Sequence, residues 1–442
     1  THVNKIANDS PFGIHDPIVP EVDSMVDVAA TGAKWVRGAG PTGIVWDGVE
    51  KQKGLYDWTR SDRIYSEAYK NGIGINAVVL VYNRLDSGER EFGYIPKNMD
   101  WYLEFLQKAV ERYDGDGIDD APGSPIIDVW EIDNELDLAW KDTPENYALL
   151  LKKSYQIIKK ANPDAKVAIA GIGDQGENNE GFRRYYTRIF KELNRTKDNS
   201  KDRYFDIISI HLYRPYNAKV KESIAEVKEE LEKIGYYNVP IWITETADFS
   251  DRPSLIVPAD ILGPVSHRSE SEQAGLLIKR YVYPLANGVK KIFWVTLSEW
   301  SSFLKGKINS SWDNVGLINN PNNDGQSHKK LAYYTYKKMV EILEGSDWSS
   351  IQKIQESGGV YIYKFNKSGK NIWVAWNDAA EKTIVIPGIA SNSVKITEAV
   401  PKYESGKDVA DYETAFNSYL QVSKDGKISL VLGDKPVFVE GN

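Results

Sequence analysis

The sequence contains no cysteine among its 442 residues. A disulfide framework, a thiolate metal site and a thiol nucleophile are therefore excluded. This absence says nothing decisive about the compartment in which the protein works.

An excess of positive charge is also missing. Lys and Arg number 55 against 63 Asp and Glu, which gives a net charge of −8. This balance provides no basic surface for nucleic acid or anionic lipid. No apolar run approaches the ~18 residues that a membrane span requires, and no obligate protein partner is evident. The chain starts at Thr1 without Met and shows no signal peptide, and we expect a mature secreted, extracellular protein.

From Phe12 onward, short apolar runs alternate with segments of helical period. We expect strands over 12–16, 34–38, 73–82, 126–132, 166–172, 205–213, 240–246 and 290–297, and helices over 20–31, 61–71, 99–112, 143–161, 181–193, 218–234, 272–285 and 328–343. Eight such units favour a parallel (β/α)8 TIM barrel, assigned to residues 1–346. A doubly wound open sheet is the alternative, but no Gly-x-Gly-x-x-Gly loop follows the first strand.

Beyond Trp348 the helical period disappears. Short alternating strands are expected over 360–365, 371–376, 383–386, 393–396, 427–432 and 436–439. They predict an all-β sandwich domain over 347–442. Trp373 and Trp376 are three residues apart, so they fall on opposite faces of one strand and at least one is in the core. This domain is therefore expected to be a structural partner of the barrel and not a carbohydrate-binding module.

Two of the barrel strands end in a glutamate. The run that begins at Ile126 turns polar at Asp133, Asn134 and Glu135, and the run from Ile241 reaches Glu245. The carboxyl ends of the strands are where such barrels place their chemistry. Two carboxylates facing one cleft are what glycoside cleavage needs, one to donate a proton and one to attack or to activate water.

With these motifs the chain resembles the retaining glycoside hydrolases that have catalytic glutamates at the ends of barrel strands four and seven, and its layout is most similar to family 39 and its relatives. The resemblance implies that Glu135 is the acid/base and Glu245 the nucleophile. It further implies substrate-binding or supporting roles for Arg37, Asn134, Tyr213 and Trp294, the last as the floor beneath the sugar at the cleaved bond. Leu136 departs from the pattern, because many members have proline there.

Further residues are candidates around this pair. Glu131 shares a strand face with Asp133 and Glu135 and is expected to be a buried support residue. His15, His211, Glu299 and Trp300 are candidate substrate-binding residues. Aromatic side chains that follow strand ends could line a cleft by stacking on sugar rings, and they are Trp46, Trp58, Tyr82, Trp140, Trp300 and Trp312. Their number favours several subsites and hence endo-acting cleavage of a β-linked oligo- or polysaccharide of the β-glucan, mannan or xylan type.

Three other functions remain open. An exo-acting β-glycosidase or β-xylosidase would use the same glutamates. A metal-dependent barrel hydrolase could use His15, Asp16 and His211, but the five histidines are scattered and no His-x-His occurs. A carbohydrate-binding relative without catalysis is disfavoured because both glutamates are present.

No cofactor is expected to be required. The one candidate for a bound ion is an acidic loop. Oxygen donors around glycine turns at Asp114, Asp116, Asp119 and Asp120 resemble a calcium loop, without the distal glutamate of an EF-hand. The alternative is an acidic, solvated turn.

Overall fold

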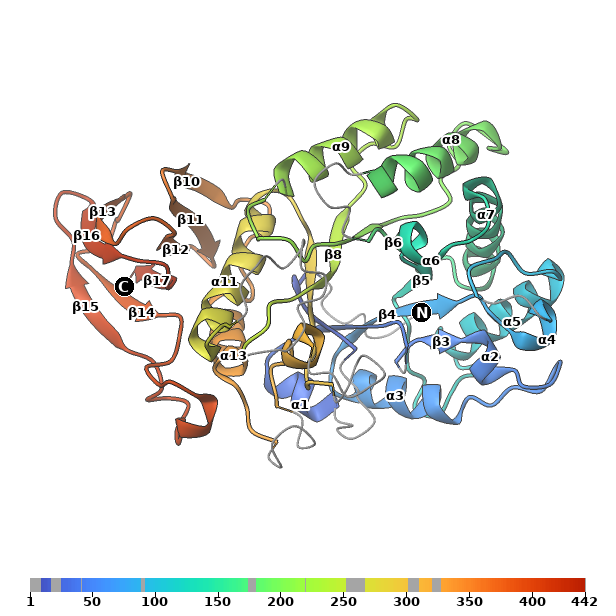
Figure 1. Cartoon of the computed structure of the whole chain (residues 1–442), viewed down its shortest axis with the longest axis horizontal. Coiled ribbons are helices and arrows are strands. Elements are labelled where there is room, and N and C mark those ends of the chain that lie inside the picture. The colour runs from blue at the N-terminus through green and yellow to red at the C-terminus, as the bar shows by residue number, and fades with distance from the viewer. Residues whose placement is uncertain are drawn as a thin grey trace.

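A barrel of parallel strands is followed in the chain by a smaller β-domain, as the computed structural model shows (Figure 1). The structure describes residues 9–16, 25–40, 42–88, 92–173, 180–218, 220–251, 267–300, 310–319 and 327–441. Residues 20–24 of the first expected helix lie outside these ranges. In the described part of the chain, no helix combines the length and apolar character needed to cross a bilayer.

Each barrel strand pairs in parallel with its neighbours. The strands are β1 (Phe12–His15), β2 (Trp35–Gly38), β4 (Gly74–Leu80), β5 (Val129–Asn134), β6 (Lys166–Gly171), β7 (Ile208–His211), β8 (Ile241–Thr246) and β9 (Lys291–Val295), with the short β3 (Ile44–Val45) beside β4. Their order is β6-β5-β4-β2-β1-β9-β8-β7. Parallel bridges Ala168↔Ile207 and Ile172↔Ile210 join the two ends of this order. The predicted barrel is therefore confirmed, and an open sheet is ruled out.

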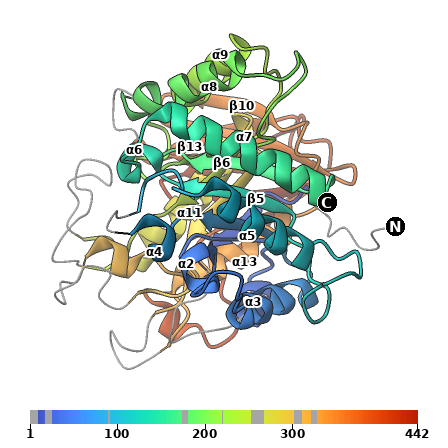
Figure 2. The same ribbon diagram turned by 90° about the vertical axis from the view of Figure 1, so that its right-hand side faces the viewer.

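Helices cover the outside of the barrel (Figure 2). The helices in this part of the chain, including short ones at the barrel mouth, are α1 (Met25–Ala30), α2 (Trp46–Val49), α3 (Thr59–Lys70), α4 (Arg84–Ser87), α5 (Met99–Arg112), α6 (Leu136–Ala139), α7 (Pro144–Ala161), η2 (Phe182–Tyr186), α8 (Thr187–Arg195), α9 (Val220–Glu232), α11 (Glu270–Ala286), η3 (Ser311–Asn314) and α13 (Leu331–Leu343). Local sequence explains where the long ones begin. Thr143 caps α7 by accepting a hydrogen bond from the Asn146 N–H, and Ser269 forms a capping box with Glu272 at α11.

The barrel interior changes character along its axis. At the end where the strands begin, it is filled by an apolar layer made of Trp35, Val129, Ala168, Ile207, Trp242 and Phe293. Nearer the carboxyl ends of the strands it contains Arg37, Asn76 and Glu131, none of which is exposed. Burial of charge is costly without partners, so a polar layer at this level marks the end of the barrel that holds a site.

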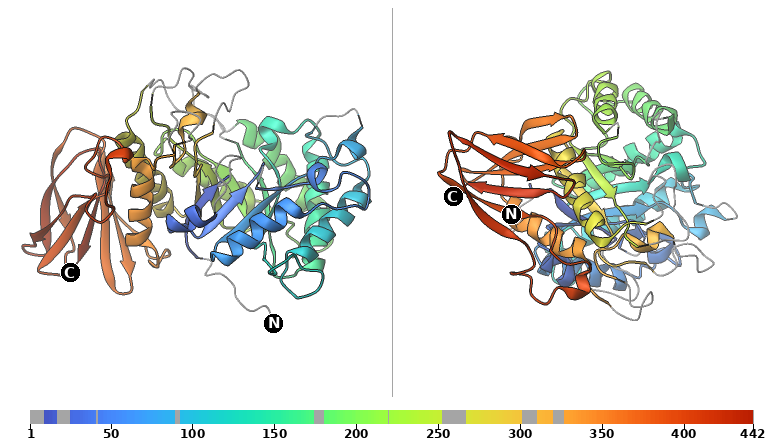
Figure 3. Two further views of the ribbon diagram at one scale, coloured as in Figure 1. Left: turned by 90° about the horizontal axis from the view of Figure 1, so that it is seen from below. Right: turned by 60° about the vertical axis from the view of Figure 1, so that its left-hand side comes forward.

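The C-terminal domain consists of two antiparallel sheets. Its strands are β10 (Gln352–Ser357), β11 (Val360–Lys367), β12 (Lys370–Asn377), β13 (Lys382–Pro387), β14 (Ser393–Glu398), β15 (Ser418–Val422), β16 (Lys427–Leu432) and β17 (Val437–Gly441), with a short helix η4 (Gly406–Asp408). Six strands form one sheet in the order β10-β11-β12-β17-β14-β15, and β13 pairs with β16. Helices α11 and α13 lie between this domain and the barrel (Figure 3).

The tryptophan pair of β12 points in opposite directions, as expected. Trp373 belongs to the core between the two sheets, and Trp376 belongs to the core that the six-stranded sheet shares with the barrel. Both side chains are buried. One face of the larger sheet is thus covered by the barrel helices, and the β-domain is packed against the barrel as part of one continuous core.

Candidate active site

Glu135 reaches the barrel mouth through an irregular strand end. Asp133 and Glu135 both have left-handed backbones, with φ of 65° and 45°. This conformation interrupts the alternation of side chains along β5. Glu131 and Asn134 consequently both reach Arg37. The expectation that Glu131, Asp133 and Glu135 share one face is wrong, because a regular strand does not extend through these residues.

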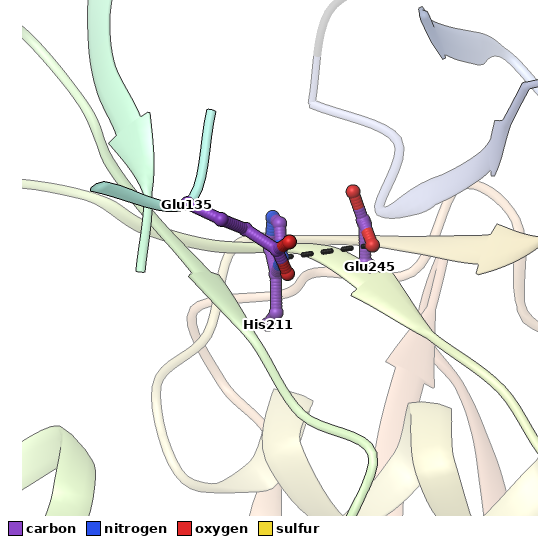
Figure 4. Close-up of side chains that lie close together, drawn as sticks. All are labelled: Glu135, His211 and Glu245. Atoms are coloured by element: carbon purple, nitrogen blue, oxygen red, sulfur yellow. Dashed lines mark hydrogen bonds and ion pairs between the residues drawn. The ribbon is translucent and has the colours of Figure 1, made fainter. Parts of the chain in front are cut away.

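Glu135 and Glu245 meet at His211 (Figure 4). His211 Nδ1 lies 2.7 Å from Glu135 Oε1 and 3.6 Å from Glu245 Oε2. One oxygen of each carboxylate and this nitrogen all lie within 4.8 Å of one another. Residues that are 110 positions apart in the sequence (245 − 135) therefore form one cluster at the carboxyl ends of β5, β7 and β8.

Glu245 is held as an anion from several sides. Its Oε1 accepts a hydrogen bond of 2.8 Å from Arg37, and its Oε2 accepts one of 2.5 Å from the Tyr213 hydroxyl. His15 Nε2 lies 3.4 Å from Oε1. Burial alone would raise the pKa of Glu245. The charges of His211, His15 and Arg37 and the Tyr213 hydrogen bond outweigh it and hold this pKa far below its usual range.

Arg37 is itself fixed by a second carboxylate. Glu131 accepts two hydrogen bonds from the guanidinium, of 2.9 and 2.7 Å, in the bidentate geometry that orients arginine best. The same carboxylate accepts from the Asn76 side chain and the Gly171 N–H, each at 3.0 Å. Glu131 is therefore a fully paired buried support residue, as expected. The role of Asn76 was not anticipated, although a polar residue within the apolar run of β4 is a usable signal.

The two histidines of the site carry their protons on different nitrogens, judged from their neighbours. His211 Nε2 is buried against Gly171, where even a Cβ atom would come within 2.2 Å of it, and it has no hydrogen-bond partner in the described chain. The proton of the ring therefore lies on Nδ1 and is donated to Glu135. His15 Nδ1 instead faces an Arg37 N–H at 3.1 Å, so His15 is protonated on Nε2.

The same surroundings shift the histidine pKa values in opposite directions. For His15, burial dominates and lowers the pKa. For His211, burial alone would lower the pKa, but the Glu245 charge and the hydrogen bond and charge of Glu135 raise it above its ordinary value. The pKa of His211 is thus raised by the negative charge of the two glutamates.

Trp294 does not lie where the resemblance placed it. Its ring is fully buried, and its Nε1 donates to the Val315 carbonyl at 3.0 Å. Because side chains alternate along β9, Val295 instead takes the position beside Tyr213, in one apolar cluster with Phe249. Trp294 therefore cannot form the floor beneath a bound sugar in this structure.

The remaining aromatic candidates divide into two groups. Trp46 and Trp140 are buried in the core, which contradicts their expected place in a cleft. Tyr82, Trp58, Trp300 and Trp312 are partly exposed. Trp58 stacks on Phe105 of helix α5, away from the glutamates. Trp312 meets the Tyr213 ring edge-on at 4.7 Å, and Trp300 packs on the same cluster.

Glu299 is also drawn into the protein interior. It is 3% exposed, and its Oε1 is paired with Lys330 Nζ at 2.5 Å. Lys330 also donates to the Asn314 carbonyl. The carboxylate is thus engaged in a buried ion pair, a position that gives no support to substrate contact.

Two groups of possible metal ligands occur among the described residues. One is Glu135, His211 and Glu245, and the other is Asp114, Asp116 and Asp120. His15 and Asp16 belong to neither, so the ligand trio of the metal-dependent alternative does not form. Asp119 does not join the acidic group. Burial, with smaller contributions from the charges of Asp116 and Asp120, raises the pKa of Asp114 to about 6.

Comparisons with known proteins agree with this architecture. Residues 133–314 match the family model described as "Glycosyl hydrolase catalytic core". No curated protein matches the chain. Among solved structures, a glucosidase from Croceicoccus marinus is similar with a TM-score of 0.65 at 11% identity, covering 99% of this chain and 97% of that one. A monomeric β-xylosidase from Caulobacter crescentus gives 0.63 at 13%, covering 98% and 96%, and a GH30 endoxylanase from Clostridium papyrosolvens gives 0.59 at 12%, covering 98% and 96%.

Proposed function

We propose that this chain cleaves β-linked sugars with retention of configuration, because residues 133–314 match the model of a glycosyl hydrolase catalytic core. The observation that carries this proposal is the spacing of the glutamates. Oxygens of Glu135 and Glu245 lie within 4.8 Å of each other. Retaining enzymes separate their carboxyl groups by about 5 Å, whereas inverting enzymes leave about 6.5–9.5 Å for a water molecule.

The surroundings of the two carboxylates divide their roles. Glu245 has an exposed side-chain fraction of 11% and is bound by Arg37 and Tyr213, so it stays ionised and serves as the nucleophile. Glu135 is more exposed, at 25%, and contacts His211. It can exchange a proton with solvent and with the leaving group, as an acid/base must.

The reaction then proceeds in two displacements. Glu245 attacks the anomeric carbon while Glu135 gives its proton to the departing oxygen, which leaves a glycosyl ester on Glu245 and a carboxylate at Glu135. Glu135 next takes a proton from water, whose oxygen attacks the anomeric carbon, so that the bond from this carbon to Glu245 breaks and the Glu245 carboxylate is released. The proton on His211 Nδ1 stabilises the Glu135 carboxylate between these steps.

Asn134 is the proposed contact to the sugar beside the reacting carbon. Its Oδ1 accepts from Arg37 at 2.7 Å. This bond directs the amide NH2 as a donor away from the arginine, where it can bind the 2-hydroxyl of the substrate. Such a contact strengthens as the oxocarbenium ion develops. His15, whose Nε2 lies 3.4 Å from Glu245 Oε1, remains a candidate substrate-binding residue.

For the substrate, we propose a β-linked oligo- or polysaccharide of the glucan, mannan or xylan type. Trp300 and Trp312 support stacking on a sugar ring, because both pack on the apolar cluster that contains Tyr213, the tyrosine bonded to Glu245. Endo-acting cleavage rests on fewer aromatics than the sequence suggested, and an exo-acting β-glycosidase or β-xylosidase is the second candidate. In either case we propose a secreted enzyme with its catalytic unit over 1–346, the sandwich over 347–442, and no obligate protein partner.

A panel of β-linked polysaccharides and aryl β-glycosides, with and without EDTA, tests this function. Mixed oligosaccharides would identify an endo-acting enzyme, and release of monosaccharide from aryl glycosides alone an exo-acting one. NMR of the first product should show the β-anomer. An α-anomer as first product would refute double displacement, loss of activity with EDTA would favour metal-dependent chemistry, and binding without cleavage would indicate a non-catalytic relative.

A further inference from the structure

The segment 212–216 carries Tyr213 and lies just beyond β7. Arg280 of helix α11 is buried behind it and donates to three of its carbonyls, those of Leu212, Tyr213 and Arg214, at 3.0–3.2 Å. Its Nε donates to Asp248 Oδ2 at 2.6 Å. A guanidinium group fixed in this way holds several acceptors in one geometry. Arg280 of α11 therefore restrains the backbone of residues 212–214, which include Tyr213.

The C-terminal domain reaches the same segment at Tyr216. The hydroxyl of Tyr216 donates to the carboxylate of Asp378, which directly follows β12, and it accepts a hydrogen bond of 2.8 Å from Trp376 Nε1. Lys279 of α11 pairs with Asp378 at 2.7 Å. Tyr216 is only 6% exposed, and its ring packs edge-on against Trp376 and Tyr361.

We propose that the C-terminal domain is a working part of the active site, because Asp378 and Trp376 hold Tyr216 and thereby fix Tyr213 on Glu245. Tyr216 and Asp378 are positioning residues and Arg280 is a third, since none of them touches the reacting atoms. Only two residues separate Tyr213 from Tyr216, so a displacement of Tyr216 also displaces Tyr213. The inference rests on the proposed function for its catalytic consequence.

The variants Tyr216→Phe and Asp378→Asn test this coupling with little change of volume. Thr335→Val is the matched control. Thr335 donates one buried hydrogen bond of 2.8 Å to the Ala399 carbonyl across the same domain interface and contacts no residue of the segment 212–216 through it. All three variants lose polar contacts between the domains, and only the first two loosen the segment.

Activity and amide exchange are measured for each variant of the full chain. For Tyr216→Phe and Asp378→Asn we expect kcat/KM to fall about tenfold, since a displacement of ~1 Å costs up to ~10²-fold. The acid limb of the kcat/KM profile should also move to higher pH, because Glu245 loses the Tyr213 bond while Arg37 and both histidines stay in place. Thr335→Val should lower only the melting temperature.

Hydrogen exchange of the peptide over 210–218 gives a readout that needs no substrate. It should become faster in the first two variants and stay unchanged in the control. Unchanged exchange there would overturn the inference whether or not the enzyme is active. Normal activity and an unmoved acid limb would overturn its catalytic part. Absence of turnover by the wild-type protein, with faster exchange in the variants, would refute the proposed function and leave the structural coupling standing.

Discussion

The variant Tyr213→Phe removes one hydroxyl group. It tests whether this hydroxyl stabilises the Glu245 carboxylate when Glu245 is released from the glycosyl ester. The hydroxyl donates a hydrogen bond of 2.5 Å to Glu245 Oε2, and both groups are buried. Hydrogen bonds to charged groups contribute about 1.5–3 kcal/mol. The Phe ring keeps the edge-on contact with Trp312, so packing is retained while the hydrogen bond is lost.

The loss should appear mainly in the second displacement. Glu245 regains its negative charge as the glycosyl ester breaks, and without the hydroxyl this charge is less stable. At ~1.4 kcal/mol per tenfold, the expected decrease in the deglycosylation rate is about 10- to 150-fold. With an aryl glycoside that has a good leaving group, the first displacement is fast, and the ester should accumulate.

The assay is a rapid-mixing measurement of phenol release from such a substrate. We expect a burst of one equivalent followed by a slow steady state in the variant. Tyr363→Phe is the control, because its buried hydroxyl also donates to a carboxylate, that of Glu356 at 2.7 Å, but does so between β10 and β11 of the C-terminal domain. An unchanged steady-state rate without a burst in Tyr213→Phe would refute the assigned role of the Tyr213–Glu245 bond.

Further predictions concern the glutamates, a buried lysine and the acidic loop. Glu245→Ala should abolish turnover and, with azide, give the α-azide product by NMR. Glu135→Ala should still cleave substrates with good leaving groups. Full activity of Glu135→Ala on unactivated polysaccharide would contradict the acid/base role of Glu135. Burial lowers the pKa of Lys291 from 10.5 to about 7, so the unfolded state binds more protons between these values and the free energy of unfolding should rise with pH from 7 to 10.5. In urea titrations, the stability of Lys291→Met relative to the wild type should therefore be greater at pH 7 than above pH 10.5, where the lysine is neutral in both states and the variant only lacks its hydrogen bond to the Ser10 carbonyl. Calcium should raise the melting temperature of the wild type but not of Asp114→Asn, and no rise in either would favour the solvated turn.

Local patterns were sufficient for the architecture. Each apolar run and each helical period is a property of adjacent residues, and eight repeats of both predicted the barrel that the structure confirms. The same reasoning placed Glu135 and Glu245 at strand ends, where the apolar runs of β5 and β8 turn polar. The placement of Trp373 and Trp376 on opposite faces of β12 followed from a period of two, and the structure buries both of them.

The directions of side chains were predicted wrongly where the backbone departs from the regular alternation of a strand. The left-handed residues Asp133 and Glu135 turned Asn134 to the same side as Glu131. At β9, a difference of one position decided whether Trp294 or its neighbour Val295 faces the site. Such choices depend on how strands meet their partners, and adjacent residues do not encode them.

The sequence by itself determined which elements form, in which order, and which two carboxylates end their strands. Only the tertiary structure decided how far apart those carboxylates lie, which nitrogen of His211 carries the proton, and that Asp378 binds Tyr216 from 162 positions away. The physical reason is that periodicity arises from neighbours in the chain. Distances, protonation and ion pairing arise from burial and from partners that only folding brings together.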